Sequence, residues 1–155
     1  MKKLFIILVT LLVTNFSFAF KSFLKPIPTV VRFTTEVQAL PNNEYNLIIH
    51  AVIDKGWHIY SQKLPDEGPL PTSIVFKKNP LISMVGKTEE VGKKEDVFDP
   101  NIKITLSYFS NKVDYVQKVK LKAKIKTQML ADITFMACNE NCLPPKTETL
   151  QFNFN

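Results

Sequence analysis

The chain has 155 residues and a mass of 17.7 kDa, which is the size of one domain with or without a targeting segment. Hydrophobic residues make up 45% and charged residues 22%, so the composition favours a folded core over intrinsic disorder. The sequence contains no dinucleotide-binding, P-loop, H-E-x-x-H or G-x-S-x-G motif. With a formal charge of +6, two cysteines and two histidines, the protein has few reactive side chains.

The first nineteen residues have the pattern of a secretory signal peptide. Lysines at positions 2 and 3 are followed by an apolar run at residues 4–12. Ser17 and Ala19 then place small residues three and one before a cut, which predicts a signal peptide at residues 1–19 and a mature domain at residues 20–155. The alternative is a membrane anchor, but the run is short for the ~20 apolar residues that a spanning helix needs. We therefore expect export, with no membrane span after cleavage.

Alternation of apolar and polar residues dominates the rest of the chain. This period of two places one face of a strand on a core and the other in water. In chain order, we expect strands at residues 30–39, 45–53, 57–60, 72–76, 102–108, 112–126, 133–137 and 149–154. Breaks rich in proline and asparagine separate them, and no amphipathic helix is evident. Short strands in this pattern predict an all-β fold, namely an immunoglobulin-like antiparallel β-sandwich.

The strand at residues 112–126 carries lysines at alternate positions from Lys118 to Lys126. Such a stripe is either a surface for phosphate groups or anionic lipid, or a solvated face whose charges discourage edge-to-edge pairing. Neither an arginine cluster nor interleaved aromatic residues accompany it. We therefore interpret the stripe as a solvated face and expect no nucleic-acid partner.

Cys138 and Cys142 form the most informative motif, because three polar residues separate them and Leu-Pro-Pro follows. The pair is expected at the tip of a hairpin, where chain reversal brings the sulfurs together. Three interpretations remain open. A structural disulfide is one, although so small a ring contributes only about 2 kcal/mol by loop entropy. A redox-active pair is the second, because a tight ring can be more reducible. The third is a copper(I) site that also uses Met136 or Met129.

Three segments together carry a family resemblance: K-G-W-H-I-Y-S-Q at residues 55–62, G-K-K-E at residues 92–95, and the cysteine pair followed by L-P-P. Over residues 30–155 the chain resembles the N-terminal periplasmic domain of the DsbD protein-disulfide reductase, in a stand-alone version. The resemblance implies an immunoglobulin-like sandwich in the periplasm that exchanges thiols and disulfides without a cofactor or metal. It implies thioredoxin-fold partners, namely a membrane-linked electron donor and an acceptor that is a disulfide isomerase or a cytochrome c maturation protein.

The resemblance also implies roles for individual residues. Cys142 would form the mixed disulfide with partners, and Cys138 would resolve it. Tyr60 would belong to the wall around the pair, with His58 on the same strand. The family's shielding cap loop maps onto Thr88, Glu89, Glu90 and Val91, but Glu90 stands where the family carries an aromatic residue, so Phe98 is a candidate shield. The alternative is a non-catalytic periplasmic binding module whose disulfide is structural.

Overall fold

The computed structural model describes residues 28–123 and 126–154, and the predicted signal peptide at residues 1–19 lies outside this range. Within the described residues, eleven strands and one short 3-10 turn (η2, Pro41–Asn43) make up the fold. No helix in this part of the chain is long and apolar enough to cross a membrane.

The strands form three antiparallel sheets. Sheet I has the order β1–β2–β8–β5 and contains β1 (Val31–Ala39), β2 (Glu44–Ile53), β8 (Lys112–Leu121) and β5 (Ile82–Val91). Sheet II has the order β11–β9–β4 and contains β11 (Lys146–Phe154), β9 (Thr127–Phe135) and β4 (Ser73–Phe76). Sheet III has the order β10–β3–β7–β6 and contains β10 (Ala137–Cys138), β3 (His58–Tyr60), β7 (Ile104–Ser110) and β6 (Lys94–Asp99).

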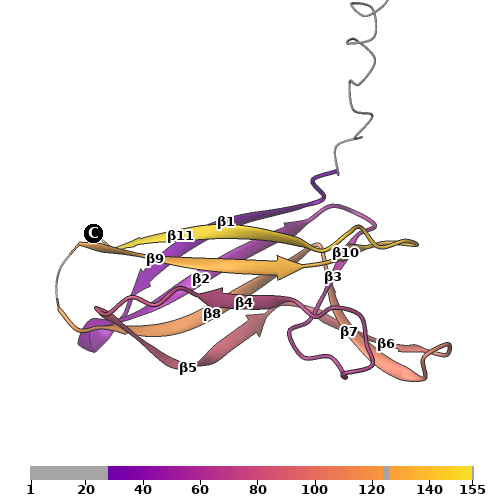
Figure 1. Cartoon of the computed structure of the whole chain (residues 1–155), viewed down its shortest axis with the longest axis horizontal. Coiled ribbons are helices and arrows are strands. Elements are labelled where there is room, and N and C mark those ends of the chain that lie inside the picture. Colours follow the sequence, from indigo (N-terminus) through magenta and orange to yellow (C-terminus); the bar gives the residue numbers. More distant parts are fainter. Residues whose placement is uncertain (1–27, 124–125, 155) are drawn as a thin grey trace, which may run out of the picture.

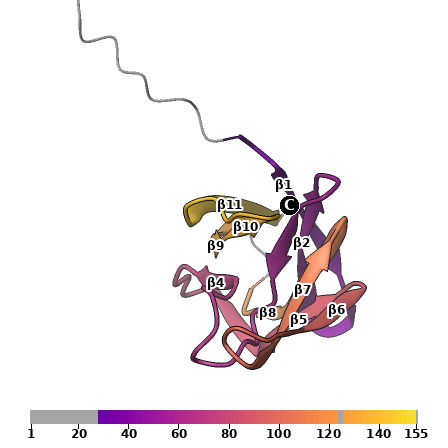
Figure 2. The ribbon, with the colours of Figure 1, turned by 90° about the vertical axis from the view of Figure 1, so that its right-hand side faces the viewer.

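Sheets I and II are the two layers of the sandwich, and the short strands of sheet III lie at one end of it (Figures 1 and 2). Alternate residues of β2, β8, β9 and β11 point inward, so that apolar side chains of both layers meet in one core. The side chains that are at most 1% exposed in this core are Leu47, Ile49, Ala51, Ile59, Phe109, Val113, Tyr115, Val119, Ala131, Ile133 and Phe152. Trp57 is partly buried and packs against the same core, as expected for its size.

One turn joins the end sheet to sheet I. The chain passes from β7 to β8 through Asn111, whose φ of 68° lies in the left-handed region that asparagine tolerates better than most residues. The carbonyl oxygen of Asn111 accepts a hydrogen bond of 2.7 Å from the backbone N–H of Ile53 at the end of β2. This turn therefore fixes sheet III against the end of sheet I.

The predicted fold class is confirmed, and each predicted strand has a counterpart with shifted ends. Strand 112–126 is shorter than expected because β8 ends at Leu121, and strand 133–137 corresponds to the end of β9 and to β10. The expectation of a loop at residues 88–91 is wrong, because these residues are the end of β5.

A β-bulge explains why the sequence pattern does not predict β5. The register between β5 and β8 shifts between Val85 and Glu89, where Gly86 has a φ of 69°. Buried Gln117 fills the break, since its amide donates to the Val85 carbonyl (3.1 Å) and its side-chain oxygen accepts from the Thr88 hydroxyl (2.8 Å). Because the bulge interrupts the alternation of side chains, residues 82–91 lack the period of two that reveals the other long strands.

Candidate functional site

The cysteine pair closes the tip of the hairpin formed by β9, β10 and β11, as expected. The Cys138–Cys142 disulfide has an S–S distance of 2.03 Å and a Cα–Cα distance of 4.0 Å. Within the turn, the Asn141 N–H donates to the Asn139 side-chain oxygen at 2.9 Å. The Leu143 N–H donates to the Ala137 carbonyl at 2.9 Å, which closes the hairpin below the ring. β11 begins just after the Pro-Pro step, since proline cannot donate to a ladder.

The two sulfur-bearing residues differ in their access to solvent. Cys138 is only 1% exposed, whereas Cys142 is exposed to solvent. The difference arises because Cys138 is the last residue of a strand in sheet III, and Cys142 lies beyond the turn. Thiol–disulfide exchange begins by attack on an accessible sulfur, so the geometry distinguishes an outer from an inner cysteine.

Sheet III aligns aromatic side chains beside Cys138. In the register of β10 and β3, Cys138 is directly opposite His58, and in that of β3 and β7, Tyr60 is opposite Tyr108. Opposed residues of antiparallel strands project from the same face, as do residues two apart on one strand. The His58 ring lies 5.4 Å from the Tyr60 ring and 4.4 Å from the Tyr108 ring, measured between centroids.

An apolar cluster surrounds the inner cysteine. Tyr60, Leu106 and Cys138 are buried together, and four partly buried side chains pack against them, namely Leu64, Ile104, Tyr108 and Met136. Cys138 therefore belongs to a small core of its own, separate from the main core of the sandwich.

The connection between β3 and β4, residues 61–72, contributes to this cluster; we call it the β3–β4 loop. Leu64 packs on the cluster, and the position of Gly68 is close to the Ile104 and Leu106 side chains. A Cβ atom added at Gly68 would lie 3.0 Å from the Pro65 carbonyl oxygen and 3.5–3.6 Å from those side chains. The loop thus packs tightly against the small core that contains Cys138.

Hydrogen bonds fix both ends of the β3–β4 loop. At its start, the Glu90 carboxylate accepts from the Ser61 hydroxyl at 2.7 Å and from the Gln62 backbone N–H at 2.6 Å. At its end, the buried Thr72 hydroxyl donates to the Tyr60 carbonyl at 2.5 Å. Glu90, at the position where the family resemblance expects an aromatic cap residue, therefore holds a different segment near the cysteines.

The other expected cap residues do not gather at the pair. Thr88 bonds Gln117 on β8, and Glu89 and Val91 are exposed on sheet I. Phe98 is 60% exposed and pairs with Thr105, whereas the adjacent Val97 pairs with Leu106 of the cysteine cluster. Because neighbouring residues of a strand point to opposite faces, Phe98 lies on the far face of sheet III from Cys138.

Burial and nearby charges shift the pKa values of two side chains in the aromatic wall. Burial lowers the pKa of His58, and the negative charge of Glu95 on β6 partly opposes that shift. Burial also raises the pKa of Tyr60, with smaller contributions from Asp99 and Tyr108. Neutral forms of these side chains are therefore favoured beside Cys138.

The described residues contain no group of three or more His, Cys, Asp or Glu side chains placed to hold a metal ion. The two methionines considered as copper ligands lie in different environments. Met136 packs against the cysteine cluster, whereas Met129 is 2% exposed within the main core.

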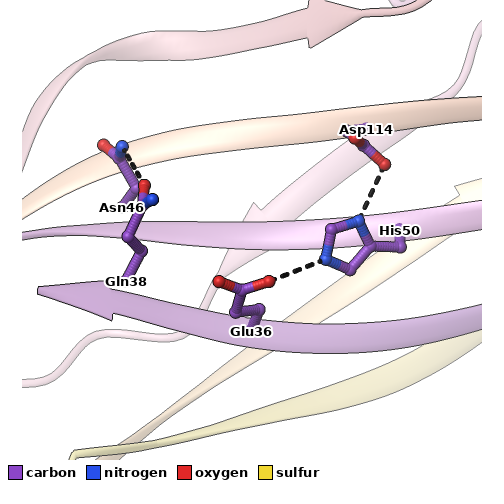
Figure 3. Close-up of polar contacts among 5 residues, drawn as sticks. All are labelled: Glu36, Gln38, Asn46, His50 and Asp114. Carbon is purple, nitrogen blue, oxygen red and sulfur yellow. Dashed lines mark hydrogen bonds and ion pairs between the residues drawn. The ribbon is translucent and has the colours of Figure 1, made fainter.

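The second histidine lies elsewhere, on sheet I. Figure 3 shows His50 between two carboxylates, with its Nδ1 atom 2.8 Å from Asp114 and its Nε2 atom 3.3 Å from Glu36. The hydrogen bond to Asp114 is the largest cause of a raised His50 pKa; burial opposes it, and Glu36 adds to it. His50 is therefore a surface ion-pair residue of a different sheet.

Several residues of the site were not predicted. The alternation in residues 102–108 places Leu106 and Tyr108 on one face of a strand, which is a usable signal, but it does not say what that face covers. No pattern in the sequence pointed to Leu64, because it lies in an irregular loop without a repeating order of apolar and polar residues.

An antiparallel sandwich with one buried and one exposed cysteine, bonded at a hairpin tip beside an aromatic wall, has the geometry that a thiol–disulfide exchange domain requires. A model of the N-terminal domain of the thiol:disulfide interchange protein DsbD matches residues 25–153. The chain belongs to this family, as the sequence resemblance predicts.

Solved structures share the fold. The N-terminal periplasmic domain of ScsB from Proteus mirabilis is 11% identical, with a TM-score of 0.59 over 83% of this chain and 48% of the other, so this chain spans about half of that structure. The reduced DsbD N-terminal domain of Neisseria meningitidis is 16% identical, with a TM-score of 0.54 over 85% of this chain and 91% of the other. The same organism's DsbD N-terminal domain in complex with the PilB N-terminal domain is 14% identical, with a TM-score of 0.50 over 86% and 94%. A search of curated proteins gives no match.

Proposed function

We propose that this domain passes reducing equivalents between thioredoxin-fold proteins in the periplasm, with Cys142 as the attacking cysteine and Cys138 as the resolving one. The unequal exposure of the two cysteines carries this assignment, since Cys138 is 1% exposed and Cys142 is exposed. The signal-peptide pattern at residues 1–19 supports export to that compartment. A membrane-linked donor and an isomerase or cytochrome c maturation acceptor are the partners that fit the family.

The reaction requires only the two sulfurs. In the reduced domain, the Cys142 thiolate attacks a partner disulfide, which forms a Cys142–partner bond and releases one partner thiolate. Cys138 then attacks the Cys142 sulfur, which breaks that bond, releases the second partner thiol and forms the Cys138–Cys142 disulfide. The domain gives up two electrons and two protons, and the donor restores them by the reverse steps.

Partner trapping with two matched variants tests this assignment. Each variant, Cys138→Ser and Cys142→Ser, removes one sulfur and leaves the other. In the periplasm, Cys138→Ser should accumulate mixed disulfides with thioredoxin-fold proteins, because its Cys142 can attack but nothing resolves the product. Cys142→Ser should accumulate far fewer, because its only sulfur is buried. Equal trapping by both variants would contradict the assigned roles.

The alternative function is a binding module with a structural disulfide. The reduction potential separates the two, because structural disulfides typically have potentials below about −300 mV and resist reduction by physiological thiols. We expect a higher potential for this pair. A reduction potential below about −300 mV, together with no partner trapped by Cys138→Ser, would contradict the exchange function and favour a binding module.

A further inference from the structure

His58 does more than line the cysteine pair, because it is the direct partner of Cys138 in a β-ladder. Its Cα atom is paired with that of Cys138 across the ladder between β3 and β10. Directly opposed residues in such a ladder have Cβ atoms roughly 5 Å apart and project from one face. The imidazole is thus the side chain that the register places directly across from the inner cysteine.

Two tyrosines hold the imidazole in place. The Tyr60 ring meets it edge-on, with an interplanar angle of 83°, and the Tyr108 ring lies at 37° with a centroid distance of 4.4 Å. His58 is partly buried, so its ring is packed against both neighbours and not free in solvent. Packing between rings does not itself require the two ring nitrogens of His58.

The resolving step needs a proton acceptor at this place. The thiolate is the nucleophile, and thiols in apolar surroundings ionise poorly. Cys138 lies in such surroundings, with 1% of its surface exposed. The titratable groups that face His58 are Cys138 from β10, Tyr60 from its own strand, Tyr108 from β7 and Glu95 from β6. Phenols are protonated at neutral pH and cannot serve as bases. Glu95 lies on β6, three strands away from Cys138, whereas His58 lies on the strand next to it.

We propose that His58 accepts the proton of Cys138 when the mixed disulfide is resolved. The inference rests on the exchange function proposed above. A ring nitrogen of neutral His58 takes the thiol proton while the Cys138 sulfur attacks the Cys142 sulfur and expels the partner thiolate. The imidazolium then returns that proton to the departing thiolate or to water. Burial of the ring, which disfavours its charged form, keeps it neutral and able to accept at pH 7.

The aromatic disulfide DTNB separates the two chemical steps in the full-length mature domain. Attack by Cys142 of the reduced protein releases a first coloured thiolate, and resolution by Cys138 releases a second. In His58→Phe, which keeps an aromatic ring, the first phase should be unchanged, and the second should be slowed at least ~10-fold at pH 7, as expected for loss of a general base. His58→Gln should behave in the same way.

The pH profile distinguishes a proton acceptor from a structural residue. The difference between His58→Phe and the wild type should shrink towards pH ~9.5, where the thiol ionises without help. His50→Phe, which changes the histidine of the other sheet, should leave both phases unchanged. A second phase that is as fast in His58→Phe as in the wild type overturns the role of His58, as does a slowing that is equal at every pH. If the wild-type disulfide resists a mild dithiol, or the reduced wild type releases only one equivalent, the exchange function itself fails and takes this role with it.

Discussion

Replacing Glu90 by alanine should release the start of the β3–β4 loop from its place near Cys138. The Glu90 carboxylate accepts two short hydrogen bonds, one from Ser61 and one from Gln62, and both are partly buried. Hydrogen bonds to charged groups contribute about 1.5–3 kcal/mol each. Water can replace part of this at Gln62. Ser61 is 1% exposed, so its hydroxyl hydrogen would lose its acceptor inside the fold, although its oxygen would still accept from the Lys63 backbone N–H at 3.1 Å. We therefore expect opening of the loop to become easier by about 2–4 kcal/mol, which corresponds to about 30- to 900-fold in the opening equilibrium.

Amide hydrogen exchange of the loop measures this opening directly. The hydrogen-bonded amides of the loop, those of Gln62, Lys63 and Gly68, should exchange faster in Glu90→Ala by that factor, while the amides of β9 should change much less. Glu89→Ala is the matched control, because this neighbouring glutamate is exposed and should leave the loop unchanged. Glu90→Gln keeps an acceptor oxygen without the charge and should fall between the two. An exchange rate in the loop that is the same in Glu90→Ala as in the wild type would refute the account of Glu90 as the residue that holds the loop.

Three further predictions concern stability. His50→Gln should lower the melting temperature at pH 6 but much less at pH 8.5. The reason is that the pKa of His50 is raised in the folded state, so its charged form contributes stability that is complete below pH ~6.5 and is lost as the pH rises through the folded-state pKa. Equal losses of melting temperature at both pH values would contradict this. Ile133→Ala should cost about 2–5 kcal/mol in denaturant unfolding because the side chain is 0% exposed, whereas Val75→Ala, at 56% exposure, should cost little; similar losses would be inconsistent with the core described above. Reduction of the Cys138–Cys142 bond should lower the free energy of unfolding by only about 2 kcal/mol, since the ring is small; a much larger loss would favour the structural role.

The sandwich was predictable because its central strands alternate strictly. β2 and β8 each bury every second side chain, so their period of two is visible without a structure. β5 and β6 were not predictable for the opposite reason, since most of their residues are exposed and neither shows a regular alternation of buried and exposed positions. In β5 a bulge also breaks the pattern.

The cysteine hairpin was predictable from local spacing, whereas its surroundings were not. Cys138 and Cys142 are four positions apart and precede two prolines, which is a purely local pattern. The packing of Leu64 on the cluster that contains Cys138 brings together segments more than seventy residues apart, through a loop without periodicity. The role of Glu90 was hidden in the same way, because a carboxylate that accepts hydrogen bonds inside a fold looks like any surface glutamate in a sequence.

The short separation of the two cysteines also affects how the chain matures. The chain has only these two cysteines, so a single intramolecular pairing exists, and closing so small a ring needs no tertiary structure. Oxidation can therefore precede or follow folding without producing scrambled isomers. The native strand pairings, by contrast, join residues far apart along the chain, and these should set the folding rate. Refolding from urea should consequently proceed without a slow thiol-dependent phase, whether the starting chain is oxidised or reduced.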